Sequence, residues 1–389
     1  MSVRLSSFWF LYMGGMGIFF PYYSLYLRRD LELSETRVGL VVAILPLVGL
    51  FLQPAWGQLA DRTGSRRGVL AAVTSGVGLA NLVLWTVDDF VTALAGTALL
   101  AIFSTAVLPL ATSVSMAAGP AHGEGTARFG PIRMWGTCGF LAMVFAFPHL
   151  LALEAASLVW MFPLTGLLSL AAGAVAMSLP RGQALELRSD RGELRGLMRH
   201  RPVARLVFLV FVAHCCIQGP IMLFPLYLTS RGGDVDDIGH MWIFMLLLEI
   251  PLIGFSSRSL RRLGARGLLT VGLLSEGVRW TICALSTDLH LIAIVQLLHG
   301  VGVAGILVGA PFYLEQAVPE RLRSTGQALV SSAGFGAGMI VSTSLGGWLL
   351  EHVGTNLPYA LAGGGALVLG LLVHRLLPEP YRPMIHREP

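Results

Sequence analysis

The chain of 389 residues contains no lysine, so all 27 of its basic residues are arginines. Charged residues make up only 13% of the sequence, about half the share that is typical of a soluble domain. Four cysteines are too few for a disulfide framework, and each lies in an apolar stretch. The net charge of +5 does not indicate nucleic-acid binding, because the arginines cluster in a few short segments.

Long apolar segments take up most of the chain. Hydrophobic residues make up 54% of the sequence, and the mean hydropathy is +0.71. A run of about 20 apolar residues is long enough to cross a bilayer as a helix, which satisfies its backbone groups internally. We therefore expect twelve transmembrane helices, roughly at Ser6–Leu27, Val38–Leu59, Gly68–Thr86, Val91–Ala117, Ile132–Leu151, Ala155–Leu179, Val203–Leu228, Ile238–Ser257, Gly267–Ser286, Leu289–Leu314, Thr325–Leu350 and Leu357–Leu376.

The positions of the arginines predict the orientation in the membrane. If the N-terminus is cytoplasmic, the odd-numbered loops hold only Arg28, Arg29, Arg37 and Arg231, and the even-numbered loops hold most of the others. Positive residues favour the cytoplasmic side of a membrane. The pattern thus predicts a multi-pass protein of the inner cell membrane with both termini in the cytoplasm. We expect a monomer that has the lipid bilayer as a partner.

An internal repeat divides the sequence into two halves. The one long hydrophilic stretch, residues 180–202, separates a predicted N-terminal six-helix bundle (1–179) from a predicted C-terminal bundle (203–389) with a short cytoplasmic tail. At an offset of about 200 residues, Phe20-Pro21 recurs as Phe224-Pro225, and Arg62–Arg66 recurs as Arg262–Arg266. Both halves would begin on the same side, which is typical of a parallel repeat about an axis along the membrane normal. The expected fold class is an all-α membrane protein of two pseudo-symmetric six-helix bundles.

Ionisable side chains interrupt the apolar segments at Glu249, Glu276, Arg279 and His299. Such groups are costly within a bilayer, so they indicate function by default. Glu276 and Arg279 are three residues apart and would share one helix face. We predict that these four residues form a functional site within the membrane. The alternatives are a static ion pair for Glu276 and Arg279, a packed polar group for His299, and contact of Glu249 with interfacial water.

The loop after the second expected helix carries a recognisable motif. Its glycine, acid and arginine spacings follow the order Gly57, Asp61, Arg62, Gly64, Arg66 and Arg67. This pattern resembles the signature of the major facilitator superfamily of transporters, G-x-L-a-D-r-x-G-r-r. The resemblance implies a two-bundle transporter fold in which these residues form a cytoplasmic gate. A glycine at position 64 would permit the tight turn.

A second resemblance narrows the group. The stretch from Arg128 to Phe140 is similar to the opening of helix five in the lactose permease, nucleoside symporter and phenylpropionate permease group, and the segments at 276–280 and 298–300 are similar to its helices nine and ten. The likeness implies that Arg133 binds substrate and that Phe140 takes the place of a sugar-stacking tryptophan. It also implies that Glu249, Arg279 and His299 belong to the coupling network.

Departures from that group limit the resemblance. The fourth expected helix has no acid to pair with Arg133, which alternatively extends toward the cytoplasmic face. Gly302 stands three residues after His299, where the lactose permease has its proton-carrying glutamate. Galactoside specificity is therefore not implied. If coupling exists, Glu249 or Glu276 must carry the proton.

Together these features predict a proton-coupled symporter that imports a small organic solute by alternating access. A protonated glutamate would leave the interior arginines in excess, which favours an aromatic or other small carboxylate. The expected binding residues are Arg133, Arg279, Phe140, Trp135, Tyr12 and Gln218. The alternatives are a nucleoside or oligosaccharide symporter, a drug/proton antiporter, and a non-transporting sensor. No catalytic or metal-binding motif is present, so we expect no enzyme activity, no metal and no cofactor beyond the coupling proton.

Overall fold

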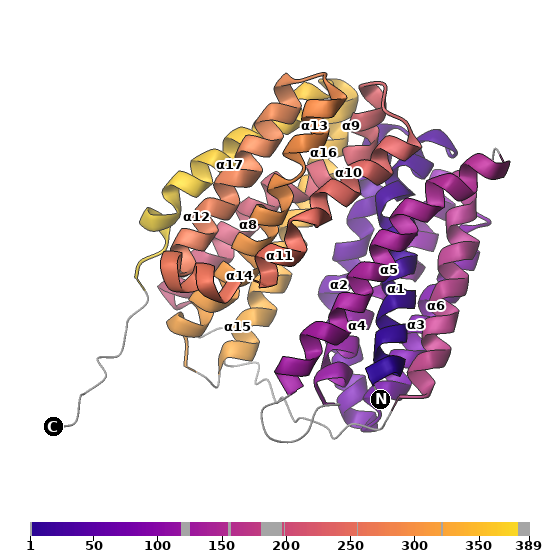
Figure 1. The fold of residues 1–389 in the computed structure, drawn as a ribbon, viewed down its shortest axis with the longest axis horizontal. Coiled ribbons are helices and arrows are strands. Elements are labelled where there is room, and N and C mark those ends of the chain that lie inside the picture. Colours follow the sequence, from indigo (N-terminus) through magenta and orange to yellow (C-terminus); the bar gives the residue numbers. More distant parts are fainter. Residues whose placement is uncertain are drawn as a thin grey trace. The chain divides into compact units, whose positions relative to one another are not determined.

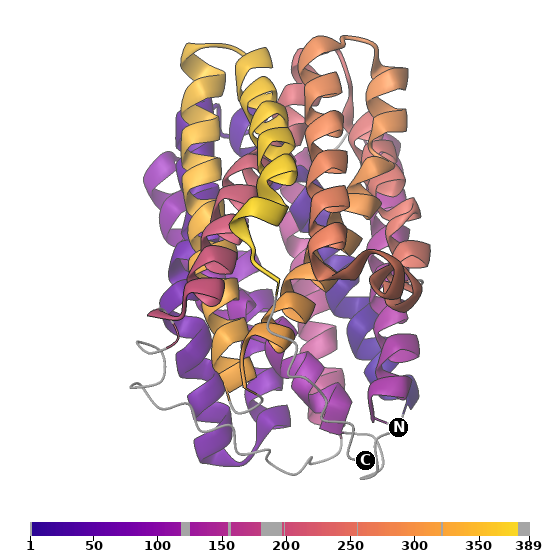
Figure 2. The ribbon, with the colours of Figure 1, turned by 90° about the vertical axis from the view of Figure 1, so that its left-hand side faces the viewer.

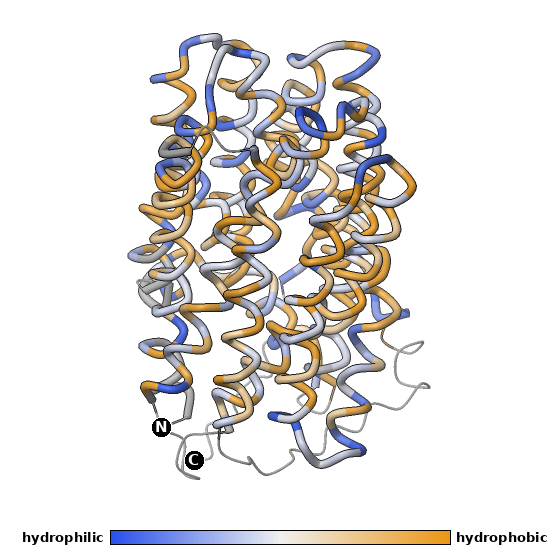
Figure 3. Tube along the Cα trace, turned by 90° about the vertical axis from the view of Figure 1, so that its right-hand side faces the viewer, coloured by the Kyte–Doolittle hydropathy of each residue, from blue (hydrophilic) through white to orange (hydrophobic). Residues whose placement is uncertain are grey.

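The structure is a computed structural model of the chain, and it describes residues 2–117, 125–154, 157–179, 197, 199–254, 256–319 and 322–379. Nearly all of these residues are helical (Figure 1). Hydrophobic residues run along the helices, and hydrophilic residues are most frequent near helix ends and connecting segments (Figure 3). In hydrocarbon a helix satisfies its own backbone groups, so this pattern is what a bilayer requires.

The predicted membrane architecture is confirmed for the described part of the chain. Eleven of its helical segments are long and apolar enough to cross a membrane, and each overlaps one expected span. The eighth expected span, Ile238–Ser257, is instead divided into α10 (Val235–Leu247) and α11 (Glu249–Gly254). The protein is therefore an all-α, multi-pass membrane protein.

The chain divides into two compact units. The first comprises Met1–Leu187, Met222–Ile243 and Thr343–His352, and the second comprises Arg188–Ile221, Phe244–Ser342 and Val353–Pro389. The division expected from the sequence, with a linker over residues 180–202, stays a prediction.

The first unit is built mainly from the N-terminal helices. These are α1 (Ser2–Arg29), α2 (Glu35–Thr63), α3 (Arg66–Leu84), α4 (Phe90–Ala117), α5 (Gly125–Glu154), the short η1 (Leu158–Trp160) and α6 (Met161–Met177), together with α9 (Phe224–Ser230). Helix α1 packs along α5, and α3 packs along α6. A Cβ at Gly17 would clash with the Phe140 carbonyl oxygen, and one at Gly139 with that of Phe10. Small residues thus let the backbones of α1 and α5 approach closely.

The second unit is built around α12 (Ser256–Leu285). It also contains α8 (Arg201–Met222), α11, α13 (Leu289–Val295), α14 (Leu298–Ala317), α15 (Arg323–Leu329), the π-helical η3 (Val330–Gly336) and α17 (Asn356–Leu376), whereas α16 (Ala337–His352) begins here and ends in the first unit. Helix α12 packs along both α14 and α17. Figure 2 shows α12 and α17 side by side.

Two expected spans of the second half are interrupted in mid-course. The eighth breaks at Leu248, between α10 and α11, and the tenth breaks at Gln296–Leu297, between α13 and α14. A Cβ at Gly300 on α14 would lie 2.6 Å from the Glu249 backbone nitrogen and 2.7 Å from the Leu248 carbonyl carbon. The glycine therefore allows the first turn of α14 to pack directly against the break beside α11. Irregular backbone at membrane depth is found where it is buried in protein or lines a cavity.

The internal repeat is visible in matching helix ends. Gly64 and Gly264 have positive φ angles of 61° and 66°. Arg67 donates to the carbonyl oxygen of Leu179 just beyond α6 at 2.7 Å, and Arg266 donates to that of Leu377 just beyond α17 at 3.4 Å. In each half, an arginine after the tight turn thus binds a carbonyl at the end of the last helix, as a pseudo-symmetric fold requires.

Candidate functional site

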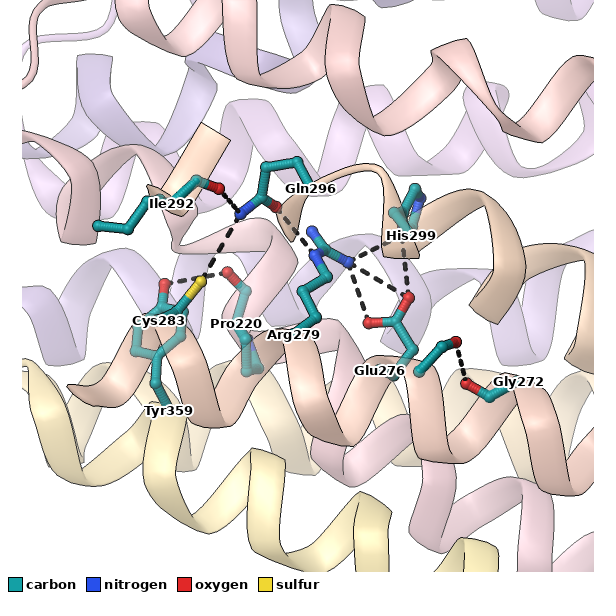
Figure 4. A network of polar contacts seen from close by, with 10 residues as sticks. Pro220, Gly272, Glu276, Arg279, Cys283, Ile292, Gln296, His299 and Tyr359 are labelled. Atoms are coloured by element: carbon teal, nitrogen blue, oxygen red, sulfur yellow. Dashed lines mark hydrogen bonds and ion pairs between the residues drawn. The ribbon is translucent and has the colours of Figure 1, made fainter. Parts of the chain in front are cut away.

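Three of the predicted coupling residues meet in the second unit. Arg279 on α12 donates from Nη1 to Glu276 Oε2 at 3.0 Å and to Oε1 at 3.3 Å. His299 on α14 places its Nδ1 2.9 Å from Arg279 Nη1 and 3.1 Å from Glu276 Oε1 (Figure 4). Glu276 is 1% exposed, Arg279 is not exposed, and His299 is 8% exposed. We name Glu276, Arg279 and His299 the buried triad.

The break in the tenth span brings a fourth polar residue to the triad. Gln296, which is fully buried, accepts a hydrogen bond from Arg279 Nε at 2.8 Å on its Oε1. Its Nε2 donates to the Ile292 carbonyl at 2.8 Å and to Cys283 Sγ at 3.6 Å. The sequence prediction missed Gln296. The signal was present, because an amide three residues before His299 shares its helix face.

The contacts of His299 Nδ1 constrain where protons lie. Arg279 can only donate hydrogen bonds, so its contact requires Nδ1 to accept. An ionised Glu276 can only accept, so its contact requires Nδ1 to carry the proton. The two contacts are compatible with one shared proton, which lies either on Glu276 with Nδ1 accepting from Arg279, or on Nδ1 with Glu276 ionised.

Glycines make room for the triad between α12 and α14. A Cβ at Gly302 would lie 2.8 Å from Glu276 Cδ and still closer to Oε1. One at Gly272 would lie 3.0 Å from the Gly305 Cα atom. Because the two backbones approach closely, the Glu276 carboxylate lies against Gly302 of α14. There it is within reach of His299, which lies one turn before Gly302 on the same helix.

Glu249 is the first residue of α11 and is half-buried. Its backbone nitrogen lies over Gly300, the residue next to His299. The backbone of Glu249 therefore lies beside the triad. Its role in proton coupling stays a prediction.

Arg133 lies on α5 in the first unit, where it is half-buried. Its guanidinium stands over the ring of Trp9, 4.7 Å from the centroid. Trp9 in turn donates from Nε1 to the Ser115 hydroxyl of α4 at 3.0 Å. Gly136, one turn along α5, leaves space for Arg133 Nη1. Substrate binding by Arg133, and by Arg279 of the second unit, stays a prediction.

The remaining predicted binding residues have varied surroundings. Tyr12 is 2% exposed and stacks on Phe8, and Phe140 is 7% exposed with its ring 5.9 Å from that of Trp242 on α10. Trp135 is 50% exposed. Gln218 lies half-buried on α8 in the second unit. Their contact with a substrate stays a prediction.

The motif predicted to form a cytoplasmic gate makes a tight turn between α2 and α3. Gly64 ends α2 in the left-handed conformation, and Arg66 pairs with Asp61 at 2.8 Å. Arg66 also donates to the Ser113 hydroxyl of α4 at 3.0 Å. Gly57 and Arg62, the other predicted members, lie in the last two turns of α2. The motif therefore joins α2, α3, α4 and the end of α6 within the first unit.

No group of three or more His, Cys, Asp or Glu residues in the described ranges is arranged to hold a metal ion. The buried triad itself offers one carboxylate, one imidazole and one guanidinium, whose chemistry suits proton transfer and contact with an anion.

Comparisons with known proteins agree on one family. Residues 2–361 match the MFS_1 like family. The chain is 32% identical over 387 residues to a maltose permease of Geobacillus stearothermophilus, covering 95% of this chain and 93% of the permease. It is 23% identical over 371 residues to a probable 3-phenylpropionic acid transporter of Escherichia coli strain K12, covering 91% and 92%.

A solved structure supports the fold. The crystal structure of the nucleoside transporter NupG superposes with a TM-score of 0.84 over 98% of this chain and 99% of that chain. The sequence identity of 16% means that this likeness shows the fold alone.

Proposed function

Since this chain belongs to the MFS_1 like family of the major facilitator superfamily, we propose that it couples transport of a small organic solute to proton movement through Glu276 and His299. Its family and its structural neighbours are transporters of small solutes and not enzymes. The resemblance read from the sequence motifs is thereby confirmed. Coupling to protons, the substrate and the direction of transport belong to the proposal.

The observation that carries the proposal is the position of His299 Nδ1 between a donor and a carboxylate. Arg279 Nη1 lies at 2.9 Å and Glu276 Oε1 at 3.1 Å. One proton therefore has two neighbouring sites, and its position decides whether Arg279 is held by an ionised carboxylate. A carrier that loads a proton with its substrate needs such a switch between charge states.

Glu276 carries the proton in this proposal, rather than Glu249. Glu276 is fully buried and contacts both other members of the triad. An ionised group at that depth is costly unless it is paired. Protonation of Glu276 weakens its pair with Arg279 and leaves the triad with a net positive charge. The bilayer-spanning bundles then change access while proton and solute are bound together.

A small carboxylate is the substrate class that this charge state favours. With Glu276 protonated, Arg279 requires an anion, and a carboxylate supplies it. The relative named for 3-phenylpropionic acid supports the same class.

A neutral oligosaccharide is the second candidate. The maltose permease is 32% identical to this chain over nearly its full length, and its name supports a sugar. A neutral solute needs no free arginine, so with such a solute the protonation of Glu276 would serve only to drive the change of access.

Orientation, location and assembly complete the proposal. The bias of arginines toward the even-numbered loops supports cytoplasmic termini and an inner-membrane location. We propose a monomer that works without a metal or cofactor. A drug/proton antiporter would expel its solute under the same gradient, and a sensor would bind a solute without moving it.

Uptake into proteoliposomes tests the proposal. Radiolabelled 3-phenylpropionate and maltose are each offered with and without an imposed pH gradient, acidic outside. We expect uptake of one of them to accelerate with the gradient in the wild type. Glu276→Gln should abolish the acceleration, because a permanently neutral side chain cannot release the proton.

The exposed Glu315 on α14 provides a matched control, and Glu315→Gln should behave as the wild type. Gradient-driven uptake that survives in Glu276→Gln would overturn the assignment of the proton to Glu276. Uptake that ignores the gradient in the wild type would remove proton coupling altogether.

A further inference from the structure

On one edge of the Arg279 guanidinium, only one of the two donor nitrogens has a hydrogen-bond acceptor among the described residues. Its Nε donates to Gln296 Oε1 at 2.8 Å, whereas no acceptor among the described residues lies within hydrogen-bonding distance of Nη2. Arg279 is not exposed at all. A buried charged donor without an acceptor is costly, and such a group in a native protein calls for an explanation.

The geometry of this edge fits a carboxylate. Nε and Nη2 point the same way and can donate two parallel hydrogen bonds to the two oxygens of one carboxylate. The Gln296 amide offers a single oxygen, so it occupies only one of the two positions. The remaining nitrogen, Nη1, is already directed at Glu276 and His299. Substrate and coupling residues would thus use opposite edges of one guanidinium.

The surroundings hold the guanidinium in place and allow the amide to leave. The ring of Trp280 lies 3.9 Å from the guanidinium carbon and defines the plane beside it. Gln296 lies in the gap between α13 and α14, where its side chain is held by the Ile292 carbonyl and Cys283 Sγ. Movement of this side chain breaks three hydrogen bonds but none in the backbone of α14.

We propose that Gln296 is an internal stand-in for the carboxylate of the transported solute. In the empty carrier its amide oxygen takes the place of one carboxylate oxygen on Arg279 Nε. On binding, the solute displaces the amide, and its second oxygen pairs with Nη2. This inference rests on the proposed transport function and assigns its substrate class as a monocarboxylate, with Gln296 as the residue that competes with it.

Binding to the purified protein in detergent, without any pH gradient, tests the inference. Isothermal titration compares 3-phenylpropionate with its neutral amide, 3-phenylpropionamide. We expect the acid and not the amide to bind to the wild type. Gln296→Ala should tighten binding of the acid about 3- to 10-fold, because the competing hydrogen bond is lost. Gln296→Glu should weaken it by at least about 10-fold, because a tethered carboxylate fills both donor positions.

Two further variants keep the result interpretable. Gln327→Glu, on α15 in the same unit, adds the same charge away from Arg279 and should bind the acid as the wild type does. Gln296→Met keeps the length of the side chain without its oxygen and should bind the acid at least as tightly as the wild type. If Gln296→Glu does not fold, Gln296→Met provides the test instead, and weaker binding of the acid than in the wild type would contradict the inference.

Several results would overturn the inference. The first is equal binding of the acid and its amide by the wild type. The second is a Gln296→Ala variant that does not bind the acid, or a Gln296→Glu variant that binds the acid as tightly as the wild type does. The third is binding of maltose that Gln296→Glu leaves intact. This last result would leave proton coupling standing with a neutral solute. Conversely, the expected binding pattern together with uptake that ignores a pH gradient would remove the proposed coupling and keep the carboxylate site.

Discussion

The carboxylate of Glu276 on α12 occupies the space that a side chain at Gly302 on α14 would need. The lactose permease, one member of the group that the sequence resembles, has an acid three residues after the helix-ten histidine, which is the position of Gly302 here. This chain instead brings an acid to that position from the neighbouring helix. The glycine at position 302 and the acid at position 276 therefore belong to one packing arrangement.

Adding a methyl group at Gly302 should disturb the triad. In Gly302→Ala the new Cβ lies 2.8 Å from Glu276 Cδ, so the carboxylate must shift away from His299. We expect a loss of stability of about 1–3 kcal/mol from overpacking, with reduced gradient-driven uptake. Thermal unfolding in detergent measures the first effect and proteoliposome uptake the second.

Gly364 on α17 is the matched control, because a Cβ there meets no atom within 4 Å. Gly364→Ala should be neutral or slightly more stable, since alanine favours helix by about 1 kcal/mol. Equal unfolding midpoints for the two variants would contradict the packing argument.

Moving the acid between helices should preserve coupling. We expect Glu276→Ala to lose gradient-driven uptake and the double variant Glu276→Ala/Gly302→Glu to regain part of it, because the new carboxylate starts from the space left by the old one. The double variant with Gly302→Gln is the control for side-chain volume. If the glutamine variant recovers as much uptake as the glutamate variant, the recovery is due to packing and not to a proton carrier.

The contact between the two helix breaks predicts a severe effect at Gly300. A Cβ at this position would meet backbone atoms of Leu248 and Glu249 at 2.6–2.7 Å, and backbone cannot move aside as a flexible side chain does. Gly300→Ala should therefore be less stable than Gly302→Ala, whose added atom meets a side chain. Thermal melts of the two variants in one detergent give the comparison, and the reverse order would show that the breaks are not held by this contact.

Repeated arginine–carbonyl contacts at the helix ends predict equivalent losses in the two halves. Arg67→Ala removes the bond to the Leu179 carbonyl, and Arg266→Ala removes the bond to the Leu377 carbonyl. Arg266→Ala also removes an ion pair with the exposed Glu379, which contributes little because it is screened by solvent. Each should cost about 1 kcal/mol, because a charged hydrogen bond in a half-exposed position is partly screened. The exposed Arg62 supplies a control of equal charge. A melting midpoint of Arg62→Ala as low as that of Arg67→Ala would point to net charge as the cause.

Much of the site could be predicted from isolated charges in apolar runs. Glu276 and Arg279 share a helix face by spacing alone, and the structure brings them together with His299. Gln296 was missed because an uncharged amide does not stand out in a hydropathy pattern. The helix breaks beside it were missed for a related reason, since the residues at Leu248 and Leu297 are apolar and continue the run.

Sequence alone determined the membrane class, the positions of eleven spans and the transporter family. These depend on the length and order of apolar segments and on turn glycines such as Gly64, which act locally along the chain. Only the tertiary structure decided that the Glu276 carboxylate lies over Gly302 and that Gln296 binds the Arg279 Nε atom. Such contacts depend on how closely α12 approaches α13 and α14, and the distance between packed helices is set by the small residues of both partners together.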